Sequence, residues 1–252
     1  MIHIHNGDIT AAIHAKHGFV APPAAYEGRF GLYRSYLGPL EAQCDRTRAT
    51  RALGEEWETL QVALKPYPAC HFVHAFADAA IALHRQGVRA EDVERITALV
   101  PAEVVKTVCE PQAAKRKPAN DYDARFSVPY VVAAALRAGK FGLAELEAGP
   151  LRDPQTLALA AKVGYAVDPG STFPRHYCGE IVVHARNGRE WRHREAVNRG
   201  CADRPLTASD IEAKFAENAA FGGAADGGRR LREAVLHLED ISARALEDAL
   251  AA

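Results

Sequence analysis

Residues 64–74 read LKPYPACHFVH. Leu64 ends an apolar run, Lys65 and two prolines follow it, and one cysteine and two histidines come next. Apolar residues alternate loosely before the prolines and predict a strand over residues 57–65. After the prolines, apolar residues recur every three or four positions, which predicts a helix over residues 70–85 that Gly87 ends. This stretch therefore predicts a strand, a rigid turn and a helix in direct succession.

The same reasoning applied outward from this stretch predicts a mixed fold. Short helices are expected over residues 9–17, 127–138, 153–163 and 207–218, and strands over residues 93–100, 180–186 and 190–194. The last two strands flank Asn187-Gly188, the strongest short signal for a hairpin. This order of elements predicts an α+β fold with a small, mostly antiparallel sheet and helices packed on it.

Composition and charge limit the class of protein. The chain has 252 residues, of which 48% are hydrophobic and 25% charged, as in ordinary globular proteins. With 31 basic and 32 acidic residues, it has no global electrostatic reason to bind nucleic acid or a membrane surface. The five cysteines include no CxxC pair, so we expect neither a disulfide framework nor a zinc site, and a cytoplasmic location.

The turn after residue 64 offers the first candidate chemistry. A lysine beside a helix N-terminus is a good receptor for a carboxylate, so Lys65 is a candidate ligand of an anion. His74 is a candidate general acid or base near neutral pH, and Asp78, four residues later, a candidate to orient it. Cys70 at the helix N-terminus is a weaker candidate, for a thiol of lowered pKa, and we assign it a packing role. The alternative is a solvated junction with a half-buried histidine.

A second candidate segment covers residues 121–130, which read DYDARFSVPY. Arg125 is a candidate clamp for a carboxylate, and Ser127 and Tyr130 are candidate hydrogen-bond donors at the head of a helix. The alternative is an N-capped helix that carries a surface arginine. The basic residues 115–117 are expected to form a solvated loop.

Taken together, residues 65–74 and 123–130 resemble the MmgE/PrpD family. Further segments agree with that family in the same order along the chain: Gly18-Phe19 with Pro22-Pro23 and Glu27-Gly28, residues 153–163, the hairpin at 187–188, and residues 205–215. No single motif is specific, but the ordered set spans nearly the whole chain.

The resemblance implies a chemistry and a domain organisation. Members of the family move a proton at a carbon next to a carboxylate of a small di- or tricarboxylate, then lose water or carbon dioxide or invert a centre, with no metal or other cofactor. They combine a large helical domain with a smaller α+β lid, and the active site lies between the two. The resemblance thus implies that residues 1–45 are the end of a helical domain, 46–200 a lid domain and 201–252 a C-terminal helical segment.

The resemblance also implies roles for individual residues. Lys65, His74 and Tyr130 match catalytic positions, while Lys65, Arg125 and Ser127 are the expected substrate-binding residues. The implied function is a lyase, either a dehydratase or a decarboxylase, on a substrate such as 2-methylcitrate or cis-aconitate. An epimerase or isomerase of the same family, and a non-catalytic carboxylate-binding or assembly module, are the alternatives. Because further active-site residues of the family lie in its helical domain, we expect a homodimer or a separate helical-domain chain as partner.

Overall fold

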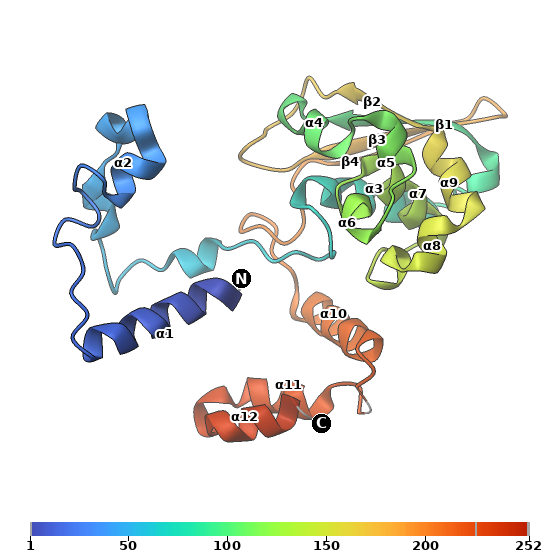
Figure 1. Cartoon of the computed structure of the whole chain (residues 1–252). Coiled ribbons are helices and arrows are strands. Elements are labelled where there is room, and N and C mark those ends of the chain that lie inside the picture. Colours follow the sequence, from blue (N-terminus) through green and yellow to red (C-terminus); the bar gives the residue numbers. More distant parts are fainter. Residues whose placement is uncertain (1, 225, 251–252) are drawn as a thin grey trace. The chain divides into compact units, whose positions relative to one another are not determined.

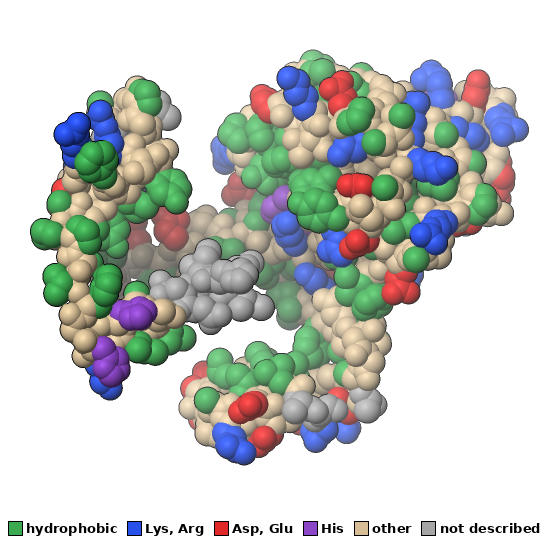
Figure 2. Space-filling view, viewed as in Figure 1, with side chains coloured by type: hydrophobic (Ala, Val, Ile, Leu, Met, Phe, Trp, Pro, Cys, Tyr) green, Lys and Arg blue, Asp and Glu red, His purple; other side chains and the backbone are tan. Residues whose placement is uncertain are grey.

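The computed structural model describes residues 2–224 and 226–250, and the chain divides into two compact units, Met1–Trp57 and Glu58–Ala252. The first unit contains the helices α1 (Ile2–Lys16) and α2 (Leu32–Leu37). Where burial is described between residues 9 and 57, Gly31 is the only buried residue. Hydrophobic side chains, among them Phe30 and Tyr36, lie on the surface of this unit (Figure 2).

The second unit is built on a four-stranded sheet in the order β2-β1-β3-β4 (Figure 1). Its strands are β1 (Val93–Val100), β2 (Val163–Val167), β3 (Gly179–Ala185) and β4 (Glu190–Glu195). The pairing of β1 with β2 is parallel, and the other two pairings are antiparallel. The predicted α+β class with a mostly antiparallel sheet is therefore confirmed.

Helices cover one face of this sheet, and further helices follow its last strand along the chain (Figure 1). The helices of the second unit are α3 (His74–Arg85), α4 (Val105–Val108), α5 (Gln112–Arg116), α6 (Asp121–Arg125), α7 (Val128–Ala138), α8 (Ala148–Arg152), α9 (Pro154–Ala161), α10 (Ala208–Phe221), α11 (Arg229–Leu236) and α12 (Ala243–Leu250). Among the residues described, no helix is both long enough and apolar enough to cross a membrane.

The core forms where α3 and α7 pack on each other and on the sheet. Eight of the 12 residues of α3 and nine of the 11 residues of α7 are buried, and both helices are rich in alanine. Small side chains let the helix backbones approach closely, while Phe76 fills the space over β3. Ser127 caps the N-terminus of α7, and Gly139 ends it in the left-handed conformation, as the sequence predicted.

One predicted element is wrong and one observed strand was not predicted, and both differences have a tertiary cause. Residues 57–65 are no strand: Glu58–Gln61 form a 3₁₀ turn, and Leu60 and Val62 are 78% and 62% exposed. Alternation alone does not make a strand where no neighbouring strand is available for pairing. Conversely, β2 was not predicted: the helix expected over residues 153–163 ends at Ala161, and pairing with β1 draws Val163–Val167 into the sheet.

Candidate functional site

The candidate site is centred on residues 64–74, which we call the lysine turn. Residues 66–69, which include both prolines, form successive bends with Tyr67 and Ala69 buried, before a 3₁₀ turn over His71–Val73 leads into α3. The Nζ atom of Lys65 donates a hydrogen bond of 3.1 Å to the carbonyl oxygen of Ala69, and His74 Nε2 lies 3.3 Å from the same oxygen. The turn thus brings together two of the predicted catalytic side chains at one backbone carbonyl.

His74 is fully buried, and its environment keeps it neutral. Burial, together with a smaller effect of the neighbouring His71, lowers the pKa of His74 to about 3. Because the Ala69 carbonyl can only accept, Nε2 carries the proton, and the buried Nδ1 lone pair has no partner. The expected pairing with Asp78 is wrong, since that carboxylate accepts instead from Tyr67 at 2.6 Å.

His71 is the more accessible histidine of the turn. Its ring is half-buried and lies 4.8 Å from that of His74 and 5.0 Å from that of Tyr177, centroid to centroid. Burial lowers its pKa, and the charge of Lys65 adds to the effect. It lines a cavity of about 300 Å³ together with Tyr177 and Asn198. His71 was not among the predicted site residues, although both histidines fall at the start of the helix predicted over residues 70–85.

The second predicted segment lies directly beside the lysine turn. The backbone N–H of Cys70 donates to the carbonyl oxygen of Arg125 at 2.9 Å, which fixes the two segments edge to edge. The Arg125 guanidinium pairs with Asp121 at 2.8 Å, and its Nε is buried without a partner. Burial raises the pKa of the Cys70 thiol, the opposite of the direction that a helix N-terminus favours.

Lys115 is a cation of the site that the sequence analysis missed. It lies in α5 rather than in a solvated loop, and its Nζ donates to the carbonyl oxygens of Thr107 and Phe126 at 2.7 and 2.8 Å. Burial lowers its pKa. The positive charges of Lys65 and Lys115 both act on Cys70, so the thiol lies near two cations. Only the fold reveals this, because the two lysines are 50 positions apart.

Ser127 and Tyr130 are occupied within the protein. The Ser127 hydroxyl accepts from the Tyr130 backbone N–H at 3.0 Å and donates to the Lys115 carbonyl at 2.5 Å. The Tyr130 hydroxyl donates to the Glu145 carbonyl at 2.5 Å, and burial raises its pKa to about 12. Tyr130 lines a cavity of about 350 Å³ to which no residue of the lysine turn contributes. Their roles in substrate binding and catalysis stay predictions.

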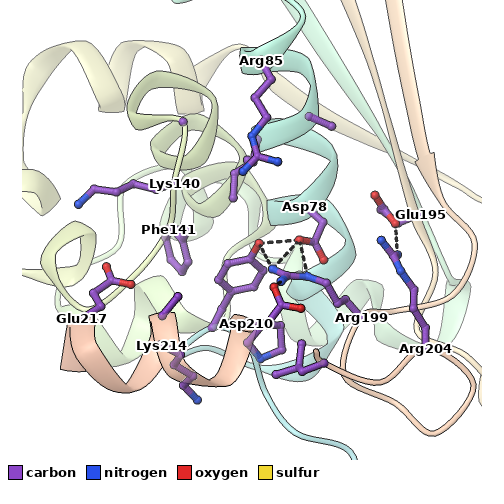
Figure 3. Close-up of a pocket in the computed structure, with 17 residues that line it drawn as sticks. Asp78, Arg85, Lys140, Phe141, Glu195, Arg199, Arg204, Asp210, Lys214 and Glu217 are labelled. Carbon is purple, nitrogen blue, oxygen red and sulfur yellow. Dashed lines mark hydrogen bonds and ion pairs between the residues drawn. The ribbon is translucent and has the colours of Figure 1, made fainter. Parts of the chain in front are cut away.

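A larger cavity of about 530 Å³ opens on the other side of the turn, between α3 and α10 (Figure 3). At its centre the Tyr67 hydroxyl, the Asp78 carboxylate and the Arg199 guanidinium bond to one another. Arg199 also pairs with Asp210 of α10 at 2.9 Å. Burial raises the pKa of the Tyr67 hydroxyl, so that it remains a donor. Among the described residues, no three His, Cys, Asp or Glu side chains gather as metal ligands would.

Comparisons with known proteins point in one direction. A family model described as the MmgE/PrpD C-terminal domain matches residues 67–240. The cis-aconitate decarboxylases of Mus musculus and Homo sapiens are each 30% identical to this chain over 187 residues. The match covers 71% of this chain and 37% of either relative, so the chain spans well under half the length of the curated relatives it matches.

Proposed function

Because the chain belongs to the MmgE/PrpD family, we propose that it is the lid-type part of a lyase that acts on a small di- or tricarboxylate. The observation that carries the proposal is the convergence of Lys65 and His74 on the Ala69 carbonyl, beside the segment that holds Arg125. The name of the two relatives favours cis-aconitate as substrate and decarboxylation as reaction, over dehydration of 2-methylcitrate.

The geometry supports the binding of an anion with several carboxylates. Lys65 uses one of its three N–H donors in the bond to the Ala69 carbonyl. This bond fixes the ammonium and leaves two donors for a substrate carboxylate. Lys115 and the unpartnered Nε of Arg125 add positive potential on the neighbouring segments. Several fixed cations offset the charge of a polycarboxylate and hold its reacting carbon in one orientation.

His74 contributes a neutral hydrogen-bonding group to this arrangement. Its Nε2–H fixes the Ala69 carbonyl that also holds Lys65, and its Nδ1 lone pair is free to accept. With a pKa of about 3, this histidine is an acceptor rather than a strong base at neutral pH. Decarboxylation suits such a site, because the electron pair released to carbon needs stabilising cations more than a basic side chain.

We also propose that the reaction needs a helical domain, on a second copy of this chain or on a separate chain, and that it takes place in the cytoplasm. The domain model that matches is that of the C-terminal part of the family, and the cysteines within the described part of the chain are all free. Light scattering tests the assembly: a dimer or a complex supports it, and a strict monomer that turns over substrate opposes it.

Calorimetric titration with cis-aconitate and citrate tests the binding proposal. Replacing Lys65 by Ala should lower the affinity by about 1.5–3 kcal/mol, the loss expected for a hydrogen bond to a charged group. Arg125→Ala should act in the same direction. Cys70→Ala is the matched control within the same turn, since its half-buried thiol is assigned only a packing role, and it should leave the affinity unchanged.

The outcomes separate the alternatives. If both charge deletions leave affinity unchanged while thermal melts stay normal, the proposed anion site is wrong. If the protein binds the acids but releases neither carbon dioxide nor water with a helical domain present, the non-catalytic binding module takes its place. Inversion of a centre without release of either would identify the epimerase alternative.

A further inference from the structure

Residues 198–200, Asn-Arg-Gly, run along the lysine turn, and each of the three bonds to a different part of it. We propose that this tripeptide is the positioning element of the site, which sets the place of Lys65 and the tautomer of His71. The inference rests on the proposed function for its consequence in substrate binding, but its structural content can be tested without a substrate.

Asn198 fixes the protonation pattern of His71. This side chain is buried, and its Oδ1 accepts from the backbone N–H of Tyr177 at 2.9 Å. That bond determines the orientation of the amide, so Nδ2 faces His71 Nε2 at 3.2 Å. An amide NH₂ group can only donate, and therefore Nε2 is the bare nitrogen and Nδ1 carries the proton.

Arg199 ties the turn to two helices at once. Its guanidinium donates to the hydroxyl of Tyr67 at 3.0 Å, to Asp78 of α3 at 3.1 Å and to Asp210 of α10 at 2.9 Å (Figure 3). Tyr67 follows Lys65 by two residues, within the proline-restricted part of the turn. Movement of Tyr67 therefore breaks its bonds to Asp78 of α3 and to Arg199, which α10 holds through Asp210, and this stiffens the segment that carries Lys65.

Gly200 brings the two backbones into direct contact. Its carbonyl oxygen accepts from the Leu64 N–H at 2.8 Å, and its φ of +93° is in the left-handed region. A Cβ at this position would lie 2.0 Å from the Leu64 carbonyl oxygen, so only glycine fits. On the other side, Lys214 Nζ of α10 donates to the Lys65 carbonyl at 2.6 Å. The backbone on either side of the Lys65 side chain is thus held from residue 200 and from α10.

These contacts define what the tripeptide does. None of its side chains is required to touch a substrate, yet each restrains one part of the lysine turn. Removing Arg199 should leave Lys65 chemically intact but free to leave the position in which its ammonium meets a carboxylate. A ligand that needs a fixed cation would then bind more weakly, because the cost of ordering the lysine falls on the binding step.

The experiment compares Arg199→Ala with Arg204→Ala as matched control. Arg204 lies on the same loop and lines the same cavity, but its side chain pairs with Glu195 and the Val197 carbonyl rather than with the turn. We expect Arg199→Ala to speed amide hydrogen exchange over residues 64–71 and to weaken citrate binding about tenfold. Arg204→Ala should cause neither change, even where it lowers the melting temperature as much as Arg199→Ala does.

A second variant tests the tautomer of His71 by NMR. A general loss of packing would not change this readout. In Asn198→Asp, the new carboxylate can only accept a hydrogen bond from His71, whereas the amide of Asn198 donates one to it. The ¹⁵N spectrum of labelled histidine at about pH 8, above the ordinary histidine pKa, should therefore shift from the Nδ1–H to the Nε2–H tautomer. Arg204→Ala should leave this spectrum unchanged.

The readouts separate this inference from the proposed function. Unchanged exchange over residues 64–71 in Arg199→Ala, or an unchanged tautomer in Asn198→Asp, would overturn the positioning role. If both change as expected while the unmutated protein binds no citrate, the positioning role stands and the proposed polycarboxylate site is wrong.

Discussion

At the scale of single residues, His74 shows how strongly burial changes the pKa that a side chain's place in the sequence suggests. Its place at the start of a helix suggested a group that titrates near neutral pH. In the structure it has no exposed surface, its pKa is lowered to about 3, and its one hydrogen bond goes to the Ala69 carbonyl. Its contribution to stability therefore depends on pH in a defined direction.

The stability of the fold should fall on acidification because of this residue. The unfolded chain takes up a proton on His74 near its ordinary pKa of 6.5, while the folded protein resists until about pH 3. Between these values the unfolded state binds more protons, so the free energy of unfolding drops by up to about 1.4 kcal/mol per pH unit as the pH falls.

Urea unfolding of the wild type and of His74→Gln across this range measures the effect. Glutamine keeps a donor for the Ala69 carbonyl but does not titrate, so the variant should lose less stability than the wild type as the pH falls from 6.5. His71 and the carboxylates are the same in both proteins and cancel in the difference. Equal losses in the two proteins would show that His74 is not held neutral by the fold.

Other residue-level features could be read from the sequence only in part. The resemblance implies that Lys65 and Arg125 serve one site, and the structure places the segments that carry them side by side. The direction of the Cys70 pKa could not be predicted, because a helix N-terminus lowers it and burial raises it. The sequence does not say how deeply the thiol is buried, and burial dominates here.

At the scale of elements, α7 is held at its start by one hydroxyl that serves two purposes. Ser127 caps the helix through the Tyr130 N–H, and it also satisfies the carbonyl of Lys115 from a different helix. The cap was predictable from the Ser-x-Pro pattern. The second bond was not, because it joins residues 12 positions apart that meet only in the folded chain.

Ser127→Ala should therefore cost more than an ordinary cap. Loss of a cap costs about 1 kcal/mol, and a buried carbonyl left without its donor adds about 1–3 kcal/mol. We expect a total of about 2–4 kcal/mol in urea unfolding. Thr207→Ala removes the exposed cap of α10 and serves as control, with an expected loss of about 1 kcal/mol. A Ser127 loss no larger than that of Thr207 would contradict the double role.

The elements that the sequence predicted well are those whose signals are local. The periodicity of α3, the caps of α7 and the Asn-Gly turn between β3 and β4 all act within a few residues. The failures at residues 57–65 and at β2 are of the opposite kind. Whether an extended apolar segment becomes a strand depends on a partner that lies far away in sequence, as Val163 does from Ile96.

At the scale of the whole molecule, the two units differ in how they are stabilised. The second has a continuous core that joins the sheet to α3 and α7. The first exposes large apolar side chains, with Val20 at 87%, Phe30 at 86% and Tyr36 at 83%. A segment with so little buried apolar surface opens at a low free energy, and its backbone is open to proteases.

Limited digestion with trypsin should therefore cut the first unit before the second. Arg29, Arg48 and Arg51 are exposed there, whereas Arg116 bonds twice to the Val163 carbonyl and Arg137 is fixed by Asp153 and Gln155. Mass spectrometry should show early products that begin after residue 29, 48 or 51 and retain the lysine turn. Early cleavage at Arg116 or Arg137 would contradict the difference in stability. A partner that covers the exposed apolar side chains should slow the early cuts without changing their order, because it adds buried surface only where the chain alone has almost none.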